Sequence, residues 1–369
     1  RLLNMIEEFD LLNLKSISHF IINHSFRATI EKINQLPQKK ATGLMTIDGY
    51  KNPVKIEICV EISENQIICD FTGTSPLDEN GINVPLVYTK AYACYALKCA
   101  IAPNIPNNAG SLAPFKIHAP VNSIVNAVHP APVALRHVIG HFIPDTIFNA
   151  LNKIVPNSVP TEGAGTLCNF QVSIRPKDPQ NKNNNQRSEV LTFNSGGSGA
   201  RPNSDGLNAT AFPSGVMTMP IEATENTGPI IIWQKELRPD SGGIGKFRGG
   251  LGQYMEVGAQ KGYVFDFQAM FDRVHYPARG QDGGGAGAPT LIKRNDGVKM
   301  KGKGKQFIPD GKKVLLAFPG GGGFGDVSDR KQSSIKRDLA LGYISKDSAK
   351  RDYGLSDQEI NAVLKNGKK

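Results

Sequence analysis

The chain of 369 residues carries a net charge of +10 and contains 39 Gly and 24 Pro, with an ordinary hydrophobic content of 39%. Its length is enough for two domains or one large domain, and it contains no run of about 18 apolar residues, so no membrane span is expected. Much of the positive charge lies near the C-terminal end without interleaved aromatic residues, which favours solvated lysine loops over a nucleic-acid-binding groove.

Five cysteines are distributed through apolar or alternating stretches of the sequence: Cys59, Cys69, Cys94, Cys99 and Cys168. Their odd number and the absence of a CxxC pair predict reduced thiols in a cytoplasmic protein rather than disulfides or a zinc site. No apolar segment follows the basic start at Arg1, so we expect no signal peptide. The missing initiator methionine predicts that the chain is a fragment.

The first elements are a helix and a hairpin. Apolar residues recur at helical spacing over residues 12–36, which predicts a long amphipathic helix. Residues 54–62 alternate apolar and polar side chains, and residues 67–71 form the returning strand. This strand leads into Asp70 and Thr72, which either form a catalytic edge or make the local hydrogen bonds of an Asx or ST turn.

Two further helices follow. One is predicted over residues 88–101, and a turn containing Asn108 comes after it. The next helix places His137 and His141 four residues apart on one face, with Arg136 beside them. This spacing suits a two-histidine metal site, but the Glu of an HExxH motif and a third ligand are missing. A His137 that polarises a substrate carbonyl is therefore favoured over a metal ligand.

The second half of the sequence alternates strand-like runs with glycine-rich loops. The densest loop, Arg238–Gln253, has glycine at six of its sixteen positions. Glycine at this density indicates a positive φ or a very close approach of the backbone to another backbone or a ligand. Two interpretations stay open. The loop offers arginines and free backbone N–H groups to an anionic or carbonyl oxygen, or it is a sheet corner locked by an Arg–Asp pair.

Similar glycine loops lie at residues 161–166, 194–202, 283–287 and 319–326. The last of them lacks the Gly-Lys-Ser/Thr ending of a phosphate-binding loop, which makes that interpretation weak. Residues 176–187 are polar and rich in asparagine, which is typical of a mobile excursion. Residues 329–369 are rich in lysine and arginine, and we expect a helical tail there. Asp329 can cap a helix that ends near Gly342, and Ser356 and Glu359 form a capping box for a last short helix.

These loops occur in an order that resembles one protein family over essentially the whole chain. The motifs are Asp70-Phe-Thr-Gly-Thr, Gly81-Ile-Asn-Val-Pro, Ile105-Pro-Asn-Asn-Ala-Gly, Ala131-Pro-Val-Ala-Leu-Arg-His, Gly196-Gly-Ser-Gly-Ala-Arg-Pro, Arg238-Pro-Asp-Ser-Gly-Gly, Pro319-Gly-Gly-Gly-Gly-Phe-Gly-Asp and Gly342-Tyr-Ile-Ser. The series resembles the hydantoinase B/oxoprolinase family. That family includes N-methylhydantoinase B subunits, the C-terminal half of 5-oxoprolinase, and the alpha subunits of acetone and acetophenone carboxylases.

The resemblance implies ATP-dependent hydrolytic opening of a cyclic amide of the hydantoin or 5-oxoproline type. A hydantoinase A-type subunit, which holds ATP and Mg, would phosphorylate the amide oxygen and so turn it into a leaving group. The B-type subunit would then activate water and stabilise an oxyanion. Two alternatives stay open: an ATP-dependent ketone carboxylase alpha-type subunit, and a truncated non-catalytic scaffold subunit.

Two features depart from the family pattern. Members normally begin well before the position that matches Arg1, with His- and Asp-rich motifs that look like a divalent-metal site. We therefore expect the metal on that missing region or on a separate N-terminal fragment, no metal ligands in this chain, and no activity from this chain alone. The second departure is His141, which stands where relatives tend to have Gln and which weighs against a role for that residue.

The predicted fold is α+β, with mixed β-sheets, flanking helices, Gly-rich loops and a helical C-terminal tail. We expect three parts: residues 1–160, residues 161–328 and residues 329–369. The predicted catalytic residues are Asp70, Thr72, Arg136 and His137. The predicted substrate-binding residues are Asn108, Gly197, Ser198, Gly199, Asp240 and Ser241, with the loop at 196–199 donating backbone N–H groups. All of them are expected around one cleft.

Overall fold

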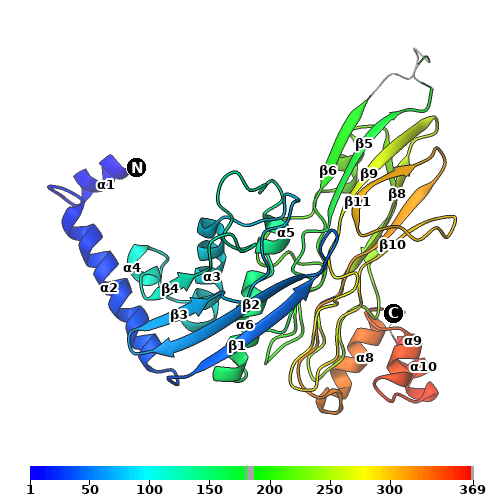
Figure 1. Ribbon diagram of the computed structural model, residues 1–369. Coiled ribbons are helices and arrows are strands. Elements are labelled where there is room, and N and C mark those ends of the chain that lie inside the picture. The colour runs from blue at the N-terminus through cyan, green and yellow to red at the C-terminus, as the bar shows by residue number, and fades with distance from the viewer. Residues whose placement is uncertain (179, 181–186, 367–369) are drawn as a thin grey trace.

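The structure, a computed structural model, describes residues 1–178, 180 and 187–366. Most of the predicted asparagine-rich excursion lies outside these residues. The described residues form three hydrophobic clusters, which lie between residues 33 and 159, 168 and 318, and 335 and 360. Mixed sheets with flanking helices confirm the predicted α+β class (Figure 1). Among the described residues, no helix is both long and apolar enough to cross a bilayer.

The N-terminal part is a four-stranded sheet covered by helices. Its strands, in the order β1-β2-β3-β4, are β1 (Lys40–Ile47), β2 (Val54–Ser63), β3 (Gln66–Asp70) and β4 (Phe115–His118). The alternation in β2 buries every second side chain from Val54 to Ile62, as the sequence predicts. Helices in this part are α3 (Leu86–Ile101), α4 (Ala109–Leu112), α5 (His137–Gly140) and α6 (Ile143–Ile154). The apolar faces of α3 and α6 pack on the sheet to form the first core.

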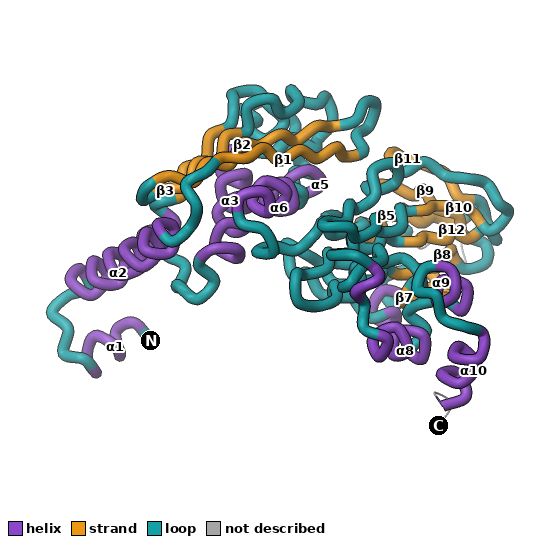
Figure 2. The backbone as a smooth tube through the Cα atoms, turned by 90° about the horizontal axis from the view of Figure 1, so that it is seen from below, coloured by secondary structure: helices purple, strands orange, loops and turns teal. Residues whose placement is uncertain are grey.

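Two helices at the N-terminus project from this sheet. They are α1 (Leu2–Glu8) and α2 (Lys15–Asn34), and Figure 2 shows them at the end of the molecule opposite the C-terminal helices. The predicted helix over residues 12–36 is confirmed by α2. This helix is less buried than a packed amphipathic helix, because only Ser25, Thr29 and Ile33 are buried while Phe20 is 68% exposed.

The second part is a sandwich of two antiparallel sheets. One sheet has the order β10-β12-β8-β7, from β7 (Ile230–Leu237), β8 (Gln253–Ala259), β10 (Leu291–Arg294) and β12 (Lys313–Ala317). The other has the order β11-β9-β5-β6, from β5 (Asn169–Pro176), β6 (Ser188–Thr192), β9 (Tyr263–Met270) and β11 (Lys303–Ile308). Their inner faces share one core around Phe170, Phe267 and Phe318, with the short helix α7 (Ile221–Glu225) beside β7.

The glycine loops form a structure of their own, which we call the glycine core: residues 161–166, 195–209, 241–252, 278–288 and 319–325. These segments contain no helix or sheet strand and run side by side between the sandwich and the tail (Figure 1). Their backbones bond to one another: Gly250 N donates to Ser198 O at 2.8 Å, and Gly321 N donates to Gly250 O at 3.0 Å. A Cβ on Gly197 would collide with Gly250 O. Close approach of backbones therefore explains the glycine density.

The tail comprises η1 (Val327–Asp329), α8 (Gln332–Ala340), α9 (Lys346–Arg351) and α10 (Asp357–Asn366). The predicted capping box is confirmed, because Ser356 N donates to Glu359 Oε2 at 3.0 Å and Glu359 N donates to Ser356 Oγ at 3.3 Å. The predicted cap by Asp329 is wrong: α8 begins at Gln332 without a side-chain cap. Asp329 lies instead in η1, where the carboxylate of Asp326 accepts from Ser328 N.

Replacement of Gly197 by alanine is expected to destabilise the protein strongly. The added methyl group would meet a backbone carbonyl that is itself held by neighbouring segments, so we expect a loss of at least about 1–3 kcal/mol in the free energy of unfolding. Gly81→Ala is the matched control, because its nearest neighbour would be 3.4 Å away. Urea denaturation of both variants measures the difference, and equal midpoints would contradict the close-packing explanation.

Candidate functional site

A cavity of about 520 Å³ lies at the seam between the N-terminal part and the sandwich. Its walls come from the β1–β2 turn, from the segment after β9 and from the segment before β11. The turn is fastened to the sandwich by Asp48, whose carboxylate accepts from Val274 N at 2.8 Å and from His275 N at 3.1 Å. This size and position between two cores are typical of small-molecule sites.

A buried ion pair forms one wall of this cavity. Lys303 Nζ lies 2.8 Å from Asp272 Oδ2, and the Asp272 side chain is fully buried. Burial raises the pKa of the Asp272 carboxyl to about 6, although the Lys303 charge acts in the opposite direction. The ammonium group also lies 5.9 Å from the centroid of the Tyr50 ring. Lys303 therefore places a cation at the cavity, held by a carboxylate that solvent does not reach.

The strand register brings polar residues together at this end of the sandwich. Met270 of β9 is paired with Asn169 of β5 on one side and with Lys303 of β11 on the other. Asn169 Nδ2 lies 3.0 Å from His137 Nε2, which joins the start of β5 to α5. An amide N–H donates in such a contact, so the imidazole Nε2 is assigned as the acceptor.

The surroundings of His137 favour its neutral form. Burial first, and then the positive charges of Arg136 and Lys303, lower its pKa. His137 does not line the seam cavity, and the positive charge of Lys303 is what links the two. An imidazole whose Nε2 is released from Asn169 can accept a proton while a cation stabilises a negative oxygen.

A second charged cluster ties the three segments behind the seam together. Arg273 Nη1 lies 3.0 Å from Glu162 Oε2, and Arg273 Nη2 lies 3.7 Å from Asp145 Oδ2. Arg273 takes a φ of 62°, a strained value for a residue with a Cβ, and its guanidinium also donates to Gly163 O at 2.8 Å. These contacts join α6, the glycine core and the sandwich, so this cluster fixes how the walls of the seam meet.

Among the predicted residues, His137 is the one that the structure places beside the seam. Arg136 is the exposed residue that precedes α5, and its charge acts on His137. Asp70 and Thr72 lie at the end of β3, where Thr72 N and Oγ1 donate to Asp70 Oδ1 at 3.0 and 2.7 Å. The structure thus shows the local-turn alternative there. Asn108 caps α4 and donates to Ser25 Oγ on α2 at 2.8 Å.

The remaining predicted residues belong to the glycine core and its edge. Gly197 N and Ser198 N donate to Pro319 O and Leu207 O, so these two groups are engaged within the core, and Gly199 lies beside them. Ser241 is buried, with its hydroxyl donating to Arg238 O at 2.6 Å and accepting from Gly252 N at 2.9 Å. Asp240 accepts from Ser345 N of the tail at 2.8 Å. These contacts lie in separate parts of the molecule, and the catalytic roles stay predictions.

Sequence reasoning misses most residues of the seam. The sequence groups Lys303 with the lysines of a solvated loop, and the structure corrects this, because its side chain is 9% exposed and paired. Asp272 directly follows the mostly apolar, strand-like run 263–271, and a carboxylate at the end of a buried strand is the signal that could have found it. Asn169 carries no local signal, since only the strand register brings it to Met270 and His137.

The described residues do not fit a metal ion. No group of three or more His, Cys, Asp or Glu side chains among residues 1–178, 180 and 187–366 is placed to hold one. His137 and His141 have ring centroids 5.8 Å apart, but His141 is 3% exposed and lies against the Tyr92 ring at 5.5 Å. Burial first, and then His137, lower the pKa of His141 to about 3. His141 therefore behaves as a packed aromatic side chain.

Asp145 makes the stability of the protein depend on pH. Burial raises the pKa of its carboxyl from 3.8 to about 7, so the folded state holds a proton that the unfolded chain has lost between these values. We expect the free energy of unfolding of the wild type to fall relative to Asp145→Asn as the pH rises through this window, by at most about 1.4 kcal/mol per pH unit. Denaturant unfolding at several pH values measures this. A flat or opposite trend would exclude it, and Asp357→Asn at an exposed carboxylate is the control.

The chain is similar to known proteins over most of its length. A family model described as Hydantoinase B/oxoprolinase matches residues 1–327. The chain is 29% identical over 377 residues to the B subunit of a putative D-/L-hydantoinase of Pseudomonas sp. strain NS671, covering 96% of this chain and 62% of that protein. It is 29% identical over 345 residues to 5-oxoprolinase 1 of Arabidopsis thaliana, covering 87% of this chain and 25% of that protein.

Two solved structures share the fold. An ATP-dependent caprolactamase from Pseudomonas jessenii superposes with a TM-score of 0.75 at 20% identity, over 98% of this chain and 66% of that chain. A nucleotide-free acetone carboxylase superposes with a TM-score of 0.75 at 15% identity, over 93% of this chain and 54% of that chain. The chain thus spans less than two thirds of the length of the Pseudomonas hydantoinase protein. From the match over residues 1–327, it belongs to the hydantoinase B/oxoprolinase family.

Proposed function

We propose that this chain is part of a hydantoinase B-type subunit that completes the ATP-dependent hydrolytic opening of a cyclic amide of the hydantoin or 5-oxoproline type. The observation that carries this proposal is the similarity over 96% of the chain to a protein named as the B subunit of a putative hydantoinase. Similarity to 5-oxoprolinase 1 of Arabidopsis thaliana over 87% of the chain supports the same substrate class. Its five cysteines are free thiols, which suits a cytoplasmic enzyme.

The seam gives this reaction a physical basis. Attack of water on the phosphorylated amide carbon gives a tetrahedral intermediate that carries negative charge on its phosphoryl oxygens and on the added hydroxyl once this loses its proton. Hydrogen-bond donors or cations fixed in advance stabilise that charge, and cleavage of the C–N bond with transfer of a proton to nitrogen then opens the ring. Lys303 and Asn169 are such groups, held by Asp272 and by the strand register. His137 is the candidate base for the attacking water once its Nε2 is released from Asn169, and the charges of Arg136 and Lys303 favour the unprotonated form that a base needs.

Other components are assigned outside this chain. A hydantoinase A-type partner would hold ATP and Mg and phosphorylate the amide oxygen, which makes an unreactive amide susceptible to water. The family resemblance implies a divalent metal, and its site is proposed to lie outside the described residues, which offer no group of three or more His, Cys, Asp or Glu side chains placed to hold one. The B-type chain alone is therefore expected to be inactive.

A ketone carboxylase alpha-type subunit is the second candidate function. The observation in its favour is the fold shared with acetone carboxylase at a TM-score of 0.75. The same cation and neutral imidazole would suit an enolate, which also carries its charge on oxygen. A non-catalytic scaffold is the third possibility, and it differs from both in predicting that substitutions at the seam leave turnover unchanged.

Reconstitution tests the reaction class. The chain is combined with its hydantoinase A-type partner and with any N-terminal region of the full-length protein, and is given ATP with hydantoin, 5-oxoproline or acetone plus labelled bicarbonate. We expect a ring-opened acid from a cyclic amide and no incorporation of label. Labelled product from the ketone would establish carboxylation instead. Turnover that requires this chain but is unchanged by substitutions at the seam would establish a scaffold.

Arg136→Met tests the electrostatic role of the site. Removal of this exposed charge is expected to raise the pKa of His137, because the charge opposes imidazole protonation, and to move the acidic limb of the kcat/KM profile to higher pH. Nuclear magnetic resonance titration of the His137 ring measures the shift independently of activity. Lys116→Met, which removes an exposed lysine from β4, is the control. An unchanged His137 pKa would remove Arg136 from the site.

A further inference from the structure

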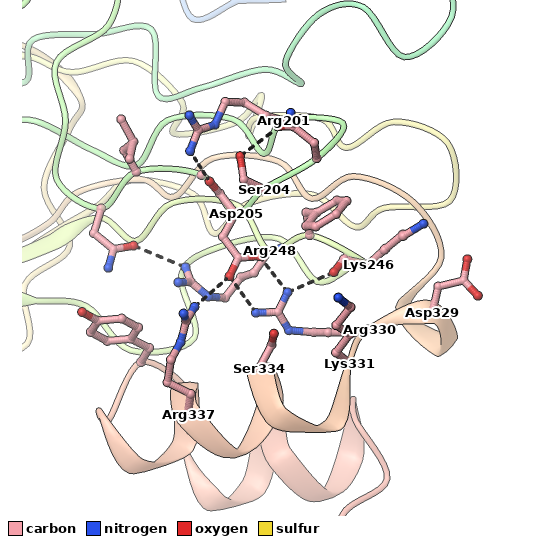
Figure 3. Close-up of a pocket in the computed structure, with 16 residues that line it drawn as sticks. Arg201, Ser204, Asp205, Lys246, Arg248, Asp329, Arg330, Lys331, Ser334 and Arg337 are labelled. Carbon is pink, nitrogen blue, oxygen red and sulfur yellow. Dashed lines mark hydrogen bonds and ion pairs between the residues drawn. The ribbon is translucent and has the colours of Figure 1, made fainter.

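A second cavity lies where the helical tail packs against the glycine core (Figure 3). Its volume is about 550 Å³, and its lining comes from residues 201–208, 246–248 and 329–343. It shares no lining residue with the seam cavity. A volume of this size holds a small organic molecule rather than a single water.

The lining is strongly cationic. Two carboxylates, Asp205 and Asp329, are outnumbered by six cationic side chains: Arg201, Lys246, Arg248, Arg330, Lys331 and Arg337. Part of this charge is balanced within the protein, as Figure 3 shows for the arginines around Asp205. Arg330 makes two bonds to Asp205 at 2.8 and 2.9 Å.

The carboxylates around the cavity pair with arginines, including the exposed Arg337, whose Nη2 lies 3.4 Å from Asp205 Oδ2. Asp338, fully buried behind the cavity, accepts from Arg330 Nη2 at 2.6 Å and from Arg248 Nε at 3.2 Å. Asp205 and Asp338 thus balance Arg248 and Arg330. Among the described residues, neither Lys246 Nζ nor Lys331 Nζ has a hydrogen bond or an ion pair. The mouth of the cavity therefore keeps an excess of positive charge, opposed there by the carboxylate of Asp329.

The Arg330 guanidinium and the start of α8 lie beside the cavity. Arg330 Nε bonds to no described residue, but it is buried from solvent, so a molecule in the cavity does not reach that atom. The first turn of α8 has no capping side chain and no acidic residue. Ser334 of that turn lines the cavity, and its N–H already donates to Lys331 O at 2.9 Å. This turn therefore adds the Ser334 hydroxyl to the donors, and no acidic side chain of its own opposes the positive end of the helix.

The cavity also has an aromatic wall. Phe247 and Tyr343 line it, and the Arg248 guanidinium carbon lies 5.4 Å from the Tyr343 ring centroid. Such rings give an organic group attached to an anion a surface to pack on. The combination suits a ligand with a compact, multiply charged end and a less polar remainder.

We propose that this cavity binds the phosphoryl group of a small phosphate-bearing molecule. A phosphoryl dianion accepts several hydrogen bonds at once, which matches the cluster of guanidinium, ammonium and hydroxyl donors lining the cavity better than a single carboxylate would. This site lies apart from the seam, and it does not depend on the reaction proposed there. Its ligand is either free phosphate or a phosphate carried on an organic group such as a nucleotide.

Calorimetric titration of the full chain at low salt tests the proposal, with inorganic phosphate, ADP without Mg, and acetate as probes. Lys246→Ala/Lys331→Ala removes two exposed lysines that make no internal pair, so folding is expected to persist. We expect this variant to weaken phosphate binding by about tenfold or more, since each lost charge-assisted contact contributes on the order of 1 kcal/mol. Lys261→Ala/Lys346→Ala removes the same charge from two exposed positions outside the cavity and is expected to change binding less than about twofold.

The probes separate the two sources of the phosphoryl group. Tighter binding of ADP than of phosphate would assign the aromatic wall to an organic group, whereas binding of phosphate alone would assign the cavity to the free ion. The proposal is overturned if phosphate and ADP both fail to bind. It is also overturned if both double variants lose affinity equally, or if acetate binds as tightly as phosphate.

Discussion

This structure depends on backbone segments that pack too closely to admit a side chain between them. The glycine core joins segments that are far apart in the sequence, and Gly321 N, Gly250 N and Gly243 N each donate to a neighbouring segment. Such contacts resemble those at the axis of collagen, where only glycine fits. The core carries the sandwich on one side and the tail on the other, so the positions of both cavities follow from it.

The elements that have a local cause could be predicted from the sequence. The alternation from Val54 to Ile62 indicated its strand, and the capping box at Ser356 indicated the start of α10. Predictions failed or stayed incomplete where the cause is tertiary. Glycine density at 241–252 indicated close approach, but no local pattern says whether the approaching group is a ligand or another backbone. In the structure the approaching group is another backbone segment. The N–H groups of Gly197 and Ser198 already donate to backbone carbonyls of neighbouring segments.

The seam illustrates why a site can escape sequence reasoning. Asn169, Met270 and Lys303 are neighbours only because three strands pair in one register, and Asp48 reaches Val274 across two cores. Lys303 and its solvated neighbours look alike in sequence, and burial beside Asp272 alone distinguishes it. His137 could be found because its imidazole and its neighbour Arg136 are close in sequence and so carry a local signal.

A scaffold made of bare backbone also constrains how such a protein can diversify. Where Gly249 and Gly321 touch, even a methyl group does not fit, so almost no substitution is tolerated at these positions of the glycine core. Changes of function are therefore expected in segments outside the glycine core, such as the turn at 48–53. The same glycine core can in this way support proteins that catalyse different reactions.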